Sequence, residues 1–178
     1  MENGRLTYPG SLHNHTDYSN ERLRDAISTI ESLADTAISL GHSVLAYTEH
    51  DTLSGYVKIE ELYKSIKEQH PDFKIIRGNE IYLCRNGLNN ENFNREKDRY
   101  FHFILLCKDL EGYHQLCELS TRAYERSYID GRQRRVPTYY QDLIEVVKLN
   151  SGHLIASSAC LVSFYDNCLL KYRETNDW

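Results

Sequence analysis

Short apolar runs alternate with amphipathic stretches along the chain, and this alternation restricts the folds open to it. The first run ends in SLHNHT (11–16), and the others are residues 43–48, 73–83, 100–107 and 153–157. Successive parallel strands need a helical crossover, so the pattern predicts an α/β fold, either a barrel or an open parallel sheet. In both, functional groups gather at the carboxyl ends of the strands.

Apolar spacing of three and four residues predicts the helices. It covers 23–38 with Gly41 as the closing residue, 56–66 with Pro71 after the end, and 110–124. A further helix is predicted over 138–149 with Thr138 as N-cap, and another reaches about residue 172. The polar stretch 84–99 is predicted to be a surface excursion or small hairpin, and the basic stretch 131–135 a solvated loop or a phosphate-backbone contact.

Composition excludes several classes of protein. The 178 residues are 40% hydrophobic and carry 21 Lys+Arg against 26 Asp+Glu, a net charge of −5, which fits one domain and argues against binding nucleic acid by overall charge. No apolar run approaches the ~18 residues of a membrane span, and the start lacks a signal-peptide pattern, so we predict a cytoplasmic protein without membrane contact. Five cysteines without a CxxC pair argue against a disulfide framework.

Histidines and carboxylates follow successive strands. His13 and His15 flank one residue of the first run, so a strand would place both side chains on one face. The later strands add Glu49, His50, Glu80, His102 and Cys160. Such a mixture of imidazole, carboxylate and thiol suits zinc or manganese better than calcium.

Each of these residues also has a simpler interpretation. A paired histidine motif occurs on plain surfaces, His102 between aromatic residues fits a core histidine, and Cys160 fits a small buried apolar residue. Glu80 is harder to explain in this way, because a carboxylate in an apolar run needs a cation or donors. The remaining histidines fit no spacing and are predicted to be surface or capping residues: His42, His70, His114 and His153.

Five segments in this order resemble the polymerase and histidinol phosphatase (PHP) domain, in the version found at the N-terminus of the bacterial DNA polymerase III α subunit. They are LHNHTDYSN, AYTEHDTLSG, IIRGNEIYL, YFHFILLCKDLEGYHQL and LIASSACL, between about residues 10 and 162. RVPTYYQDL resembles forms from Gram-positive bacteria and their phages.

The resemblance implies a set of metal ligands. These are His13, His15, Asp25, His50, Glu80, His102 and Cys160, with Asp17 competing with Asp25. The resemblance also makes Glu80 the bridging carboxylate and implies a catalytic group of His13, His15, Glu80 and His102. Glu49 stands where the family usually has Asp, in a supporting role.

The resemblance further implies a distorted (β/α)7 barrel that binds up to three divalent ions of zinc, manganese or iron. No Asp-x-His follows Cys160, so we expect residues 1–178 to be one PHP domain that stops after about five β/α units, without the polymerase core. The expected function is a phosphoesterase or 3′-5′ exonuclease-type site of a replicative polymerase, weak or inactive in this chain alone. The implied partners are DNA through the full-length polymerase, a proofreading exonuclease subunit and other replisome proteins.

Two alternatives stay open. The chain could be a non-catalytic structural or docking module of the polymerase, or a free-standing phosphomonoesterase of the histidinol phosphatase type. Metal content separates the catalytic site from the docking module, and the preferred substrate separates the two enzymes.

Overall fold

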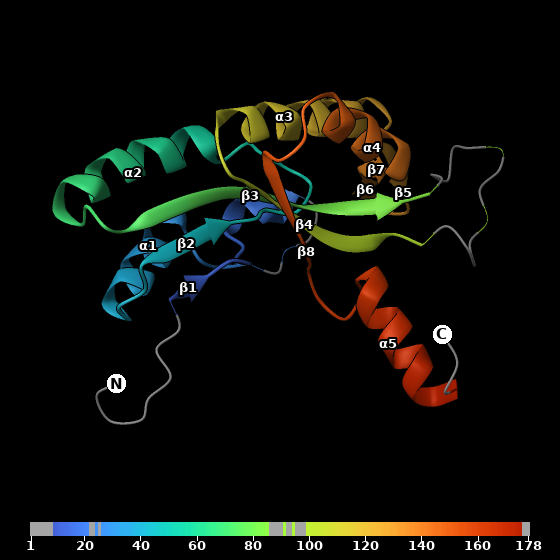
Figure 1. Cartoon of the computed structure of the whole chain (residues 1–178), viewed down its shortest axis with the longest axis horizontal. Helices are drawn as coiled ribbons and strands as arrows, with labels where there is room; N and C mark the ends of the chain where they lie inside the picture. Colours follow the sequence, from blue (N-terminus) through green and yellow to red (C-terminus); the bar gives the residue numbers. More distant parts are fainter. Residues whose placement is uncertain are drawn as a thin grey trace.

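The protein has a mixed α/β fold with a curled, half-barrel sheet (Figure 1). The computed structural model describes residues 9–21, 24, 26–85, 91, 94 and 99–175. The strands are β1 (Gly10–Ser11), β2 (Val44–Tyr47), β3 (Lys74–Cys84), β4 (Phe101–Cys107), β5 (Tyr128–Asp130), β6 (Gln133–Arg135), β7 (Pro137–Tyr139) and β8 (Leu154–Ser158). The helices are the 3-10 helix η1 (Asp17–Glu21), α1 (Ile30–Ser39), α2 (Tyr56–Gln69), α3 (Leu110–Glu125), α4 (Tyr140–Leu149) and α5 (Phe164–Thr175).

The main sheet has the order β1-β2-β3-β4-β8, with β7 paired to β3. β1, β2 and β3 are parallel, as predicted, because α1 and α2 provide the crossovers between them. The expectation of an entirely parallel sheet is wrong, because β4 runs antiparallel to both β3 and β8. β3 and β4 are consecutive strands of the chain and pair directly with each other.

Four helices cover one face of this sheet. α1 and α2 pack on β2 and β3 through a cluster that includes Ile30, Tyr47 and Ile59. α3 and α4 pack on β3 and β4 through a second cluster that includes Leu105 and Leu119. Burying these apolar side chains is the main stabilising contribution to the fold.

The opposite face carries a smaller apolar cluster of Ala46, Ile104 and Leu106, to which these helices contribute no side chain. Side chains alternate between the faces of a strand, so Glu80 on β3 lies on this face beside its register partner Ile104. His102 lies two residues from Ile104 on β4 and shares the same face. The sheet therefore presents its candidate ligands on the face that α1–α4 leave open.

Several element boundaries differ from the sequence predictions. α1 begins at Ile30 rather than near residue 23, because Thr29 and Ser32 form a capping box. Gly41 follows the helix with φ +73°, in the left-handed region predicted for it. Thr138 is not an N-cap: it lies in β7 opposite Leu83, and α4 begins two residues later.

The structure describes one of the two predicted loops in full and the other only in part. The basic stretch 131–135 forms the turn and second strand of a two-stranded hairpin, β5–β6. Most of the polar stretch after β3 lies outside the described residues.

α5 lies on the side of the sheet opposite α2, α3 and α4 (Figure 1). None of its residues is buried, and Tyr165 and Leu169 are exposed. In the described ranges, no helix is both long enough and apolar enough to cross a membrane.

Candidate metal centre

The first two histidines of the site flank Asn14, which fixes this segment against the end of β2. The Asn14 backbone N–H donates to Thr48 Oγ1 (3.0 Å), its side-chain amide donates to the Ala46 carbonyl (2.9 Å), and its carbonyl accepts from the Thr48 N–H (3.0 Å). With Asn14 facing β2, His13 and His15 face Glu80 on β3. The predicted convergence of the two rings is confirmed, although the strand itself, β1, ends before them at Ser11.

Glu80 lies at the floor of the site, with a side chain that is 1% exposed. Its Oε2 is 2.6 Å from His13 Nε2 and 3.0 Å from His15 Nε2, and these two nitrogens are 2.9 Å apart. Two imidazole nitrogens and one carboxylate oxygen thus converge on a single point.

The second oxygen of Glu80 faces a different pair of histidines. His102 Nδ1 lies 2.6 Å from Oε1, and His50 Nδ1 lies 3.6 Å from it. Cys160 is exposed, and its Sγ lies 3.4 Å from His102 Nδ1. Glu80 therefore links two groups of candidate ligands, one through each oxygen.

The strand directions explain why residues so far apart in sequence meet here. His50 and Cys160 follow the carboxyl ends of β2 and β8, whereas His102 lies at the start of β4. Because β4 is antiparallel, its start lies at the same edge as the ends of its neighbours. The site is thus assembled from the carboxyl ends of parallel strands and the amino end of one antiparallel strand.

The electrostatics of the site depend on Glu80. Burial alone would raise its pKa, but the close contacts of its carboxylate with the imidazoles of His102, His13 and His15 outweigh burial and hold the pKa far below its usual range. The hydrogen bond to Glu80 also raises the pKa of His13, against the opposing effect of burial. Within the described residues, every ion-pair partner of Glu80 is a histidine. This carboxylate is balanced by groups that can also bind a metal.

The three converging atoms of His13, His15 and Glu80 fit a divalent cation. They lie within 4.8 Å of one another. Ligand atoms around a tetrahedral zinc are about 3.3 Å apart, so separations of 2.6–3.0 Å need to widen by a few tenths of an ångström. Imidazole nitrogen with carboxylate oxygen is a donor set that suits zinc, manganese or iron.

Glu49 supports the site from behind. It is fully buried, and its carboxylate accepts hydrogen bonds from the Thr16 N–H, the Thr16 hydroxyl and the Ser19 hydroxyl. Sequence reasoning assigned a supporting role to Glu49 but missed both hydroxyl partners. A usable signal was present, because a carboxylate at the end of a buried strand needs donors, and these two residues closely follow the histidine pair.

A model of the PHP domain family matches residues 11–178. The chain belongs to the PHP domain family. A DNA-directed DNA polymerase of Bacillus phage SPbeta is 36% identical over an alignment of 173 positions that covers 93% of this chain and 13% of the polymerase. The DNA polymerase III subunit alpha of Chlamydia muridarum is 35% identical over 165 residues, 92% of this chain and 12% of the subunit. This PHP domain thus spans about an eighth of the length of these curated relatives.

Among solved structures, the PHP domain is similar to a Bifidobacterium adolescentis protein provisionally assigned as a metal-dependent phosphoesterase. The TM-score is 0.39 and the sequence identity 17%, and the match covers 79% of this chain and 44% of that one.

The sequence resemblance implies Asp25, with Asp17 as its competitor, for one acidic ligand of the PHP domain. Asp25 lies outside the described residues. Its competitor Asp17 is exposed at the start of η1 and does not belong to the metal-ligand group of the described residues. Among the histidines predicted to be surface or capping residues, His153 contacts Asp109, the N-cap of α3, at 2.8 Å.

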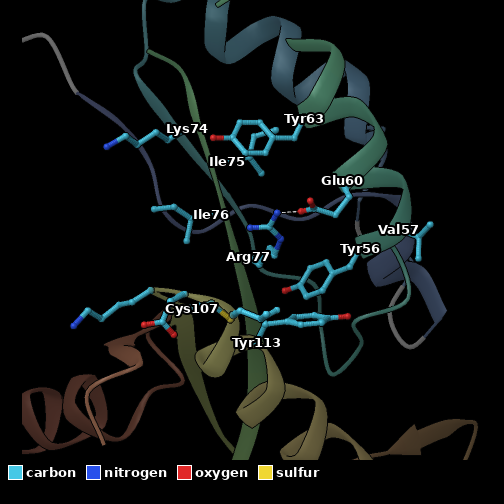
Figure 2. Close-up of a pocket in the computed structure, with 13 residues that line it drawn as sticks. Tyr56, Val57, Glu60, Tyr63, Lys74, Ile75, Ile76, Arg77, Cys107 and Tyr113 are labelled. Atoms are coloured by element: carbon cyan, nitrogen blue, oxygen red, sulfur yellow. Dashed lines mark ion pairs between the residues drawn. The ribbon is translucent and has the colours of Figure 1, made fainter. Parts of the chain in front are cut away.

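A cavity of about 640 Å³ lies away from the metal centre, between α2, β3 and the start of α3 (Figure 2). Several of its charged and polar groups have partners. Arg77 pairs with Glu60, and the Tyr56 hydroxyl donates to the Gly78 carbonyl. Lys108 donates to the Gly152 carbonyl (2.7 Å). The metal-ligand group of the described residues lies instead at Glu80.

Proposed function

We propose that this PHP domain is part of a replicative DNA polymerase of the polymerase III α type, and that its Glu80 centre is a metal-dependent phosphodiesterase site of the 3′-5′ exonuclease kind. The polymerase relatives support the first part, because they match 92–93% of the chain. The matched region is a small part of those proteins, so the activity and partners of the whole polymerase are also proposals.

The observation that supports a metal site most strongly is the surrounding of Glu80 by four imidazoles. His13 and His15 would hold a cation together with Oε2 of Glu80. His102, with His50 and Cys160 nearby, would be the candidate ligand beside Oε1. A bound divalent cation would supply Lewis acidity, which polarises a phosphoryl oxygen and lowers the pKa of water. We propose zinc, manganese or iron, according to the donor set.

The residues of the site differ in their exposure to solvent, and this determines from which side a substrate can approach. Glu80 is closed to solvent, whereas the His13 side chain is 32% exposed and Cys160 lies at the surface. A phosphodiester could therefore approach from the exposed side of His13 while Glu80 stays in a dry environment. Low solvent access strengthens the interactions of Glu80 with charged groups.

Paired measurements of metal binding and hydrolysis test this proposal. We expect the chain to bind zinc or manganese, and His13→Ala to lose both that binding and any release of nucleotides from 3′-labelled single-stranded DNA. His114→Ala is the matched control, because His114 is an exposed histidine on α3. It should behave as wild type.

The outcomes also separate the alternatives. Metal binding without hydrolysis of DNA, in the chain and in the polymerase that contains it, would favour a structural or docking module. Preferential hydrolysis of histidinol phosphate would favour a free-standing phosphomonoesterase. Hydrolysis that survives in His13→Ala would contradict the proposed site.

A further inference from the structure

Ser19 connects the buried carboxylate of Glu49 to the metal centre. Its side chain is fully buried, and its hydroxyl has three polar neighbours. It donates to Glu49 Oε2, accepts from the His50 backbone N–H (3.1 Å) and lies 3.0 Å from His15 Nδ1.

The proton of this hydroxyl is committed to Glu49. A serine hydroxyl has one proton and two lone pairs, and an ionised carboxylate can only accept. Both oxygens of Glu49 already face donors, since Thr16 contributes its backbone N–H and its hydroxyl. The Ser19 proton therefore points at Glu49, and one of its lone pairs is used by the His50 N–H.

The second lone pair of Ser19 determines the state of His15. Ser19 has no proton left for His15, so Nδ1 of His15 must be the donor of the 3.0 Å hydrogen bond. In a neutral imidazole with a proton on Nδ1, Nε2 carries the lone pair. Nε2 is the atom that lies 3.0 Å from Glu80 Oε2 and 2.9 Å from His13 Nε2.

We propose that Ser19, held by Glu49, is a positioning residue that fixes His15 in the Nδ1–H tautomer and so presents the Nε2 lone pair to a divalent cation. The ligand role of His15 rests on the proposed function, whereas the tautomer follows from the lack of a free proton on Ser19. The lone pair on His15 Nε2 then accepts from His13 Nε2, which lies 2.9 Å away. Partners of this kind orient a metal-binding histidine and strengthen it as a ligand. The hydrogen bond also fixes the ring between Ser19 and Glu80.

The tautomer can be measured directly by NMR. Long-range ¹H–¹⁵N correlations of the imidazoles distinguish Nδ1–H from Nε2–H, and loss of a signal set in His15→Gln assigns His15. In the metal-free chain, at a pH where the ring is neutral, we expect the Nδ1–H form. An Nε2–H form in the wild type would overturn the proposal, and this measurement needs no Ser19 variant.

Variants of Ser19 test its role in metal binding. Ser19→Ala should shift His15 towards the Nε2–H form and weaken zinc or manganese binding by about 10- to 100-fold. Ser19→Thr, which keeps the hydroxyl, should restore the wild-type tautomer. Ser39→Ala on the exposed end of α1 is the matched control and should change neither property. An unchanged tautomer in a folded Ser19→Ala protein would refute the role of Ser19.

This inference and the proposed function fail in different ways. A chain that shows His15 in the Nδ1–H form but binds neither zinc nor manganese supports the tautomer assignment and contradicts the proposed function. A chain that binds metal with its neutral His15 in the Nε2–H form contradicts the positioning role and leaves the proposed function standing.

Discussion

Replacing Glu49 with glutamine tests the buried network behind the metal centre. Glu49 is 0% exposed and has four contacts with donors. The Thr16 N–H lies 3.2 Å from Oε1 and 2.9 Å from Oε2, the Thr16 hydroxyl lies 2.7 Å from Oε1, and the Ser19 hydroxyl donates to Oε2. Glutamine keeps the size of the side chain, but one of its two terminal atoms becomes a donor.

The expected loss of folding stability in Glu49→Gln follows from these contacts. Whichever way the glutamine turns, its NH₂ group faces the Thr16 N–H, which cannot rotate away, and one hydroxyl, which must reorient. Hydrogen bonds to charged groups contribute about 1.5–3 kcal/mol each, and a buried donor left unpaired costs about 1–3 kcal/mol. We expect Glu49→Gln to lower the free energy of unfolding by about 2–4 kcal/mol.

Urea unfolding followed by circular dichroism measures this difference. Glu118→Gln is the control, because Glu118 is an exposed acid that pairs with Arg122 on the same helix. It should leave the unfolding midpoint close to that of the wild type. If Glu49→Gln is as stable as Glu118→Gln, the reasoning about the buried carboxylate is wrong.

Three further predictions concern the packing that holds the site. Asp142 on α4 is buried and accepts two hydrogen bonds from Arg126, so Asp142→Asn should cost about 1–3 kcal/mol in urea unfolding, while the exposed Glu145→Gln should have little effect. Burial would raise the pKa of Asp142, but the hydrogen bonds from Arg126 outweigh burial and lower it. The stability that ionised Asp142 contributes is therefore present above about pH 4 and is lost on acidification. A stability difference between the wild type and Asp142→Asn that persists at low pH would contradict this. Gly78→Ala should destabilise by about 1–3 kcal/mol, because an added Cβ would lie 2.8 Å from a backbone oxygen of β4; unchanged thermal unfolding would rule out this clash. Ile59 is fully buried on α2, so Ile59→Ala should cost about 2–5 kcal/mol, and a smaller loss in urea unfolding would mean that the core collapses around the missing atoms.

The sequence predicted the features that depend on local periodicity. Alternating apolar runs and helical spacing located β2, β3, β4, α2 and α3 close to their observed bounds. Gly41 was assigned correctly because a left-handed residue after a helix favours glycine. The meeting of His13, His15 and Glu80 was also anticipated, because strand ends at one edge of a sheet lie close together.

Features that depend on tertiary pairing could not be predicted in this way. The direction of β4 is set by its pairing with β3 and β8, and an apolar run reads the same in either direction. Thr138 is a good N-cap residue, yet pairing with β3 draws it into a strand. Ser19 shows no periodic pattern, and its role becomes visible when Glu49, His15 and His50 are placed around it.

The metal content of the chain and of Glu80→Gln tests the central claim most directly. Purified protein would be titrated with zinc and with manganese, and bound metal would be measured after dialysis. We predict that the wild type retains at least one ion per chain and that Glu80→Gln binds at least about 10-fold more weakly, because it loses the carboxylate that joins the two groups of histidines. A wild-type chain that retains no metal, or a Glu80→Gln protein that binds as tightly as wild type, would contradict the account.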